Sequence, residues 1–151
     1  MTQQEIPLRG GNVSTVVRVG DTVRRPVGEH SPGVHAFLRQ LQTAGFDGAP
    51  RFLGVDEQGR EILSYVEGDP AFAPVPSGDD VLFQIGRLLC RLHEAAEGFV
   101  PPPNASWAWE VSPPDEQEVM CHLDHFWTNV IFRDGAPTAL IANRKAIERW
   151  L

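Results

Sequence analysis

The sequence predicts an α+β protein of 151 residues, with short antiparallel strands on both sides of two amphipathic helices. Three observations support this class. Segments rich in β-branched residues flank Gly-Asp, Asp-Glu-Gln-Gly and Asp-Gly turns, which is typical of hairpins. Two segments carry apolar residues at helical spacing. The length suits one domain of ordinary size with a real hydrophobic core.

The first third of the chain is expected to form strands and one helix. The segment VSTVVRV is β-branched, Gly20-Asp21 is a turn, and TVRRP follows as a second short strand. Ser31-Pro32 begins a helix, because proline is favoured in the first turn, and Gly45 ends it. A second hairpin follows, since RFLGV and EILSYV flank the polar turn DEQGR.

A hinge or linker and a second helix come next. The segment EGDPAFAPVPSGDD is rich in proline, glycine and acidic residues, which is typical of a linker. Asp79 or Asp80 is expected to cap the helix that follows and that extends to Ala95-Ala96. The apolar residues of this helix recur at helical spacing and predict a wide buried stripe: Val81, Leu82, Ile85, Leu88, Leu89 and Leu92.

The last third is expected to be irregular at first and then rich in strands. The connection GFVPPPNASWAWEVSPPDE contains five prolines, and its two tryptophans are expected to pack it. It is followed by a strand at VMCHL, the loop DHFWTN, a strand at NVIF, the turn RDGA and a strand at TALIA. The final residues, NRKAIERWL, are expected to form a short helix.

Charge and composition exclude several classes of partner. The formal net charge of -7 argues against nucleic acid and anionic membranes, which attract basic proteins. The N-terminus lacks the apolar core of a signal peptide, and no apolar segment approaches the length of a membrane span. Cys90 and Cys121 form no CxxC pair, so neither a disulfide framework nor a zinc site is indicated. We therefore expect a cytoplasmic protein.

One motif points to chemistry. His122, Asp124 and Asn129 have the spacing H-x-D-x-x-x-x-N, and two strands joined by a tight turn follow. Together with the order of elements, HLDHFWTNVIFRDGAPTALI resembles the aminoglycoside phosphotransferase family, over about Leu8 to Ile141. The resemblance implies a protein-kinase-like N-terminal lobe of antiparallel strands plus one helix. An incomplete, C-terminally truncated helical lobe would follow, with ATP and Mg²⁺ bound between the two lobes.

The resemblance also implies roles for single residues. Asp124 would accept the proton of a small-molecule hydroxyl, His122 would brace the loop, and Asn129 would bind Mg²⁺. Arg24 or Arg25 would contact the phosphates of ATP in place of the family's lysine. The loop over the phosphates would contain Gly10 and Gly11, and backbone groups near Ser64 to Val66 would face the adenine.

The sequence departs from the family at three further places. Ala142, followed by Asn143, stands where the family has a second metal-binding aspartate, and an asparagine brings no negative charge to Mg²⁺. The helix before Gly45 offers His35 where the family has a glutamate, and an exposed histidine is the simpler interpretation. The segments that the family places after Ile141 are missing. We therefore expect a phosphotransferase impaired by truncation, with domains at 1–66, 79–142 and an atypical tail at 143–151, and a hinge at 67–78.

Other interpretations remain open. His122 and Asp124 could simply pair on a surface loop. The run MCHLDH resembles a metallohydrolase ligand run in which methionine replaces the first histidine, but zinc needs at least three good ligands. A non-catalytic alternative is a kinase-derived binding domain that forms a homodimer. A truncated lobe would expose the apolar faces of the second helix and of NVIF and TALIA, and Ile147, Trp150 and Leu151 of the tail could cover them.

Overall fold

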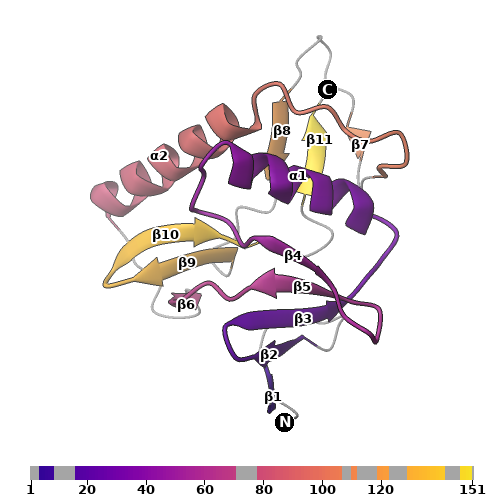
Figure 1. Ribbon diagram of the computed structural model, residues 1–151. Coiled ribbons are helices and arrows are strands. Elements are labelled where there is room, and N and C mark those ends of the chain that lie inside the picture. The colour runs from indigo at the N-terminus through magenta and orange to yellow at the C-terminus, as the bar shows by residue number, and fades with distance from the viewer. Residues whose placement is uncertain are drawn as a thin grey trace.

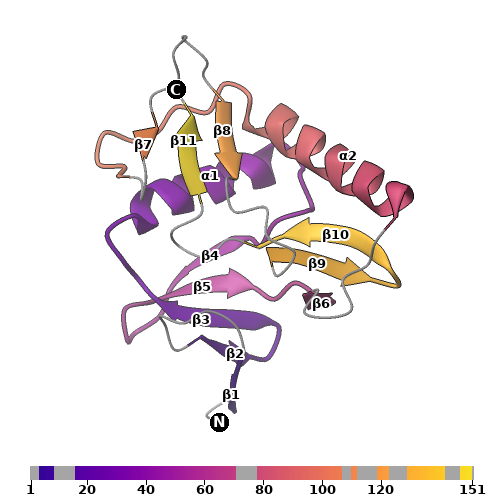
Figure 2. The same ribbon diagram turned by 180° about the vertical axis from the view of Figure 1, so that it is seen from behind.

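The computed structural model describes residues 4–8, 16–70, 78–106, 110–111, 119–122, 129–141 and 147–150. Two helices and eleven strands lie in these ranges, and the strands form three sheets. Figures 1 and 2 show the elements from opposite sides. In chain order the elements are β1 Glu5–Pro7, β2 Val17–Val19, β3 Thr22–Pro26, α1 Ser31–Thr43, β4 Phe52–Val55, β5 Arg60–Ser64, β6 Asp69–Pro70, α2 Asp79–Ala96, β7 Glu110–Val111, β8 Val119–His122, β9 Val130–Arg133, β10 Ala136–Leu140 and β11 Ile147–Trp150.

The N-terminal sheet has five antiparallel strands in the order β1-β2-β3-β5-β4, and α1 lies across one of its faces (Figure 1). This confirms the predicted combination of antiparallel strands and one helix. Strand β1 was not predicted, because its three residues are exposed and carry no alternating pattern. The helix contributes its apolar side to the core, where Val34, Phe37, Leu38 and Leu41 are buried.

Local sequence signals explain where α1 begins and ends. Proline lies in the first turn, as predicted. At the other end Gly45 has a φ of 76°, which a glycine adopts without steric cost. The amide of Phe46 donates to the carbonyl of Leu41 at 2.9 Å, and the amide of Gly45 to that of Gln42 at 3.1 Å. This is the Schellman arrangement, and it directs the aromatic ring of Phe46 into the core.

The second sheet joins the hinge segment to a hairpin from the last third of the chain. Its order is β10-β9-β6, and β6 pairs antiparallel with β9 through Asp69↔Phe132 and Pro70↔Ile131. The β9–β10 hairpin turns at Asp134 and Gly135, whose φ values of 52° and 79° match a two-residue turn of the primed type. Figures 1 and 2 place this hairpin between α2 and the N-terminal sheet.

One continuous core unites these parts. Buried residues from α1, β4, β5, α2, β9 and β10 belong to the same cluster. The predicted exposure is wrong for Leu88, Leu92, Val130, Phe132 and Leu140, which are all buried in this cluster, whereas Phe83 of α2 is 67% exposed. The buried residues of α2, β9 and β10 share this cluster with α1 and with Phe46 of the loop after it.

Two details of α2 differ from the expectation. The residue at its N-cap is Gly78, and no side chain caps the helix, so the predicted cap at Asp79 or Asp80 is wrong. Both aspartates lie in the first turn, where their negative charges interact favourably with the positive end of the helix dipole. Leu82 does not belong to the buried stripe either, since 55% of it is exposed.

The third sheet, in the order β7-β11-β8, corrects the interpretation of the tail. Residues 147–150 form strand β11, which pairs parallel with β7 and antiparallel with β8. The expected short helix is wrong, because an isolated helix of this length is marginal in water whereas a strand edge offers a full ladder of hydrogen bonds. Within the described ranges, neither helix is long and apolar enough to cross a bilayer.

Candidate functional site

The two neighbouring arginines of β3 serve opposite faces of the sheet. Side chains alternate along a strand, so residues directly opposite each other on β3 and β5 share one face. Val23 pairs with the buried Leu63, and Arg25 pairs with Glu61, which places both pairs on the face that α1 covers. Arg24 therefore lies on the other face. The structure thus separates two residues that the sequence left as alternatives.

Arg25 and Glu61 form a buried ion pair on the covered face. The Nε group of Arg25 donates to Oε1 of Glu61. The Glu61 side chain has an exposed fraction of 0%, and that of Arg25 is 13%. The pair comes from two hydrogen-bonded strands in direct register, so the sheet itself brings the two groups together.

His35 of α1 completes this cluster. Its Nε2 lies 2.6 Å from Oε2 of Glu61, and its ring stacks on Phe52 with centroids 3.7 Å apart and planes inclined by 15°. The side chain is only 12% exposed, so the simpler expectation of an exposed helix histidine is wrong. The reason is helical spacing, since His35 lies four residues after the buried Ser31 and three before the buried Leu38, on the side of α1 that faces the sheet.

The cluster keeps Glu61 ionised. Burial alone would raise the pKa of this carboxyl group, but the hydrogen bond from His35 and the charge and hydrogen bond of Arg25 lower it more, so the pKa lies below its usual value. An ionised carboxylate only accepts hydrogen bonds, so Nε2 of His35 carries the proton at this contact. We name Arg25, Glu61 and His35 the inner-face cluster.

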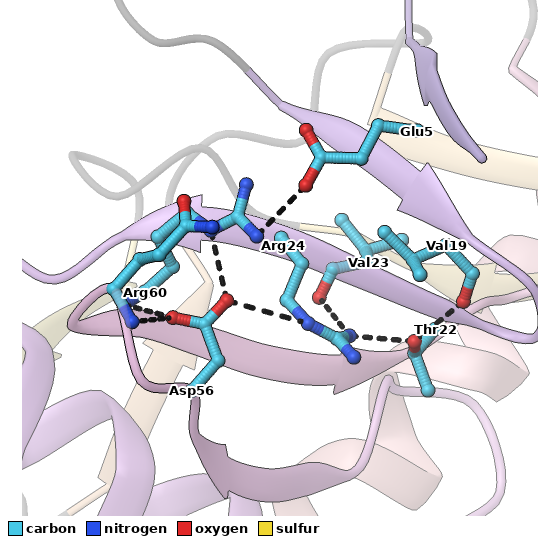
Figure 3. A network of polar contacts seen from close by, with 8 residues as sticks. Glu5, Val19, Thr22, Val23, Arg24, Asp56 and Arg60 are labelled. Atoms are coloured by element: carbon cyan, nitrogen blue, oxygen red, sulfur yellow. Dashed lines mark hydrogen bonds and ion pairs between the residues drawn. The ribbon is translucent and has the colours of Figure 1, made fainter. Parts of the chain in front are cut away.

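Arg24 belongs to a different network on the outer face, shown in Figure 3. Its guanidinium group donates to the Thr22 hydroxyl at 2.5 Å and lies 3.6 Å from Asp56. Asp56 also binds Arg60 at 2.8 Å, and Arg60 reaches Glu5 on β1 at 2.9 Å. These contacts tie β1, β3 and the β4–β5 turn together, and they explain Arg24 as a structural residue.

The end of β5 and the residues directly after it have well-defined backbone partners. The amide of Ser64 donates to Arg51 and that of Tyr65 to Asp21, both at 2.9 Å. Among the hydrogen bonds between described residues, none uses the amide of Val66. The guanidinium group of Arg18 covers the Tyr65 ring at 3.6 Å from its centroid, which fixes the start of the hinge.

Asn129 directly precedes β9 and is 9% exposed. Its carbonyl oxygen accepts a hydrogen bond of 2.8 Å from the amide of Ile141, which directly follows β10. The hairpin thus brings the backbones of Asn129 and Ile141 side by side. Position 142 itself lies outside the described residues.

Close backbone approaches hold this hairpin against the N-terminal half. The amide of Leu140 donates to the carbonyl of Gly48 at 2.9 Å. A Cβ atom on Gly68 would lie 2.5 Å from the carbonyl oxygen of Phe132, so only glycine fits beside β9 at this point. Asn129 and the hinge are consequently anchored to the same three-stranded sheet.

Several predicted site residues lie outside the described residues: Gly10, Gly11, Asp124, Ala142 and Asn143. His122 ends β8, and its backbone pairs with Ile147, while its side chain is not described. Among the described residues, no group of three or more histidine, cysteine, aspartate or glutamate side chains is arranged to hold a metal ion. The predicted roles of these residues stay predictions.

Sequence reasoning missed Glu61, which the structure places at the centre of the cluster. A signal was present. In EILS, Glu61 and Leu63 are two positions apart and therefore share a face, so a carboxylate was directed toward the same side as a core leucine. A charge in such a position requires a partner, because burying it alone is costly.

Comparisons with known proteins show which proteins this chain resembles. No protein-family model matches the chain. A trifolitoxin immunity protein from Rhizobium leguminosarum bv. trifolii is 40% identical over 141 residues, which cover 91% of this chain. The chain spans about half the length of this curated relative, 54%.

Two solved structures resemble the whole chain. A choline/ethanolamine kinase family protein from Mesorhizobium loti superposes with a TM-score of 0.64 and 19% identity, covering 99% of this chain and 60% of its own. The GDP complex of aminoglycoside 2′-phosphotransferase-IIIa gives a TM-score of 0.64 and 16% identity, covering 96% of this chain and 68% of its own. The chain therefore has the kinase-like fold of the aminoglycoside phosphotransferases and the choline/ethanolamine kinases, as the motif indicated.

Proposed function

We propose that the chain binds a nucleoside triphosphate and transfers its γ-phosphoryl group to a hydroxyl of a small molecule. The observation that carries this proposal is the inner-face cluster, because it places one arginine of β3 on the covered face of a sheet in a kinase-like fold. In protein kinases the phosphate-binding lysine occupies β3. Arginine binds phosphate through a planar fork, so Arg25 is the residue that we assign to the phosphates.

The base of the nucleotide would lie against the hinge. The amides of Ser64 and Tyr65 are engaged within the protein, whereas that of Val66 has no partner among the described residues. We therefore narrow the expected adenine contact to the backbone of Val66. The similar aminoglycoside phosphotransferase was solved with GDP, so a guanine nucleotide belongs in the test beside ATP.

Asn129 and Asp124 would serve the transfer itself. Asn129 would contribute one amide oxygen to a metal site, whereas Mg²⁺ prefers carboxylate and phosphate oxygens. Mg²⁺ would neutralise charge on the phosphates, and Asp124 would orient the acceptor hydroxyl and take its proton. Because Ala142 brings no carboxylate to this region, we propose that Mg²⁺ adds less to nucleotide affinity here than in a chain with aspartate at that position.

The proposal is tested by calorimetric titration of the purified chain with ATP and with GTP, each with and without Mg²⁺. Binding of either nucleotide at micromolar to millimolar concentration supports it, and no binding of either contradicts it. Transfer is tested separately with radiolabelled nucleotide and a panel of alcohols. The expected transfer disappears in Asp124→Ala, and transfer that survives this substitution would remove Asp124 from the mechanism.

A second candidate function rests on the curated relative. Because that protein is named a trifolitoxin immunity protein and shares 40% identity, protection of cells from a toxin is a candidate role. The two proposals are compatible, since a phosphoryl group added to a toxin could inactivate it. The test is survival of toxin-sensitive cells that express the chain, compared with cells that express Asp124→Ala. Equal protection by both chains would favour binding without chemistry.

A further inference from the structure

We propose that Glu61 is the positioning residue for Arg25: it holds the guanidinium group toward the nucleotide phosphates from the neighbouring strand, and His35 connects this contact to α1. This inference rests on the proposed function, because it requires a nucleotide at the inner-face cluster. It assigns the orienting carboxylate to β5, whereas protein kinases take the corresponding glutamate from the helix that faces β3.

The geometry of the pair favours orientation over simple charge neutralisation. Arg25 meets Glu61 through Nε, and a contact at Nε fixes the plane of the guanidinium group. The two terminal nitrogens of an arginine carry the parallel N–H groups with which it binds phosphate as a fork. A carboxylate at Nε therefore sets the direction of the fork, and a lysine would not respond to such a contact in the same way.

Each oxygen of Glu61 has a separate partner. Oε1 accepts from Arg25, and Oε2 accepts from His35 at 2.6 Å, so the carboxylate plane is fixed at both ends. The His35 ring is itself held by its stack on Phe52 of β4. The register of β3 and β5 thus places the arginine independently of the helix, and α1 contributes a second contact to Glu61 through the His35 ring.

A purely structural role is the competing explanation. A buried ion pair contributes little net stability compared with apolar residues of similar size, because both charges lose their hydration. The outer face of the same strands carries an arginine–carboxylate pair as well, Arg24 and Asp56, at 3.6 Å. That pair provides a matched control, since it links β3 to the β4–β5 hairpin but lies on the other side of the sheet.

The experiment compares the affinities of the full chain for ATP and for adenosine by calorimetry, in the wild type, Glu61→Gln and Asp56→Asn. Glu61→Gln is expected to weaken ATP binding about 10-fold, since hydrogen bonds between charged groups contribute on that scale. Adenosine binding is expected to change less than twofold, because adenosine has no phosphate. Asp56→Asn is expected to leave the ratio of the two affinities unchanged. Equal changes for both ligands in Glu61→Gln, or no change, would overturn the inference.

A second pair of variants covers the case in which Glu61→Gln fails to fold by circular dichroism. His35→Leu removes the donor to Glu61, whereas His35→Gln keeps an N–H donor near the same place. The ratio of ATP to adenosine affinity is expected to fall in the leucine variant and to recover in the glutamine variant. An unchanged ratio in His35→Leu would overturn the inference. Wild-type protein that binds adenosine but not ATP, or neither, would refute the proposed function itself.

Discussion

Replacing Gly68 with alanine tests how the hinge is fixed to the β9–β10 hairpin. A Cβ atom at this position would lie 2.5 Å from the carbonyl oxygen of Phe132 and 2.6 Å from a methyl group of Ile131. The φ of Gly68 is 130°, a conformation that alanine rarely adopts. Backbone strain and overpacking therefore act together in Gly68→Ala.

Gly54→Ala separates these two costs. Gly54 has a φ of 138°, but a Cβ atom there would meet nothing within 4 Å. The backbone cost of about 1–3 kcal/mol applies to both variants. The overpacking cost of about 1–3 kcal/mol applies to Gly68→Ala alone. We expect Gly68→Ala to lower the free energy of unfolding by about 1–3 kcal/mol more than Gly54→Ala, the difference being the overpacking cost.

The assay is urea unfolding of both variants. Their free energies of unfolding are compared with one common slope for the dependence on urea concentration. If the two variants lose the same stability, Gly68 does not lie against β9 as described. Nucleotide affinity provides a second readout. Gly68→Ala moves the hinge against β9, the strand that follows Asn129, so it is expected to weaken ATP binding, whereas Gly54 lies on β4, an edge strand of the N-terminal sheet.

Three further predictions concern stability. Leu92→Ala is expected to cost about 2–5 kcal/mol by urea unfolding because Leu92 is 2% exposed, whereas Leu82→Ala on the same helix is expected to cost less than about 0.5 kcal/mol. Equal losses would contradict the orientation of α2. Because the folded-state pKa of Glu61 is lowered, its stabilisation is full above the unfolded pKa of about 4.3 and is lost as the pH falls through the folded value. The stability difference between the wild type and Glu61→Gln should therefore shrink below about pH 4, and a constant difference would refute this assignment. Finally, Nε2 of His93 is buried without a hydrogen-bond partner among the described residues, so His93→Leu is expected to be neutral or stabilising in thermal unfolding. His30→Leu, which breaks a contact of 3.1 Å with Ser106, should destabilise by about 1 kcal/mol, and the reverse order would contradict the two environments.

The elements that the sequence predicted are those with local causes. Proline near the start of α1, Gly45 at its end and the Asp134-Gly135 turn each act within a few residues, and the structure confirms all of them. Strands β6 and β11 were not predicted, because each exists only through a partner that is distant in the chain. The tail was expected to be helical because its own residues do not reveal the backbone hydrogen bonds that β11 forms with β8.

The candidate site shows the same limit at the level of side chains. The sequence reduced the phosphate contact to Arg24 or Arg25, but it could not choose between them, because both belong to one strand. The choice depends on register, which pairs Arg25 with Glu61 and directs Arg24 to the outer face. Alternation within EILS marked Glu61 as facing the core, yet its partners come from β3 and α1 and are visible only in the fold.

The most direct test of the account compares ATP affinity in Arg25→Gln and Arg24→Gln by calorimetry. The two substitutions remove the same charge from adjacent positions of one strand, so their effects on net charge are identical. The account predicts that Arg25→Gln weakens ATP binding at least 10-fold, whereas Arg24→Gln changes it less than twofold. Equal losses in both variants, or a larger loss in Arg24→Gln, would contradict the claim that the inner-face cluster binds the nucleotide phosphates.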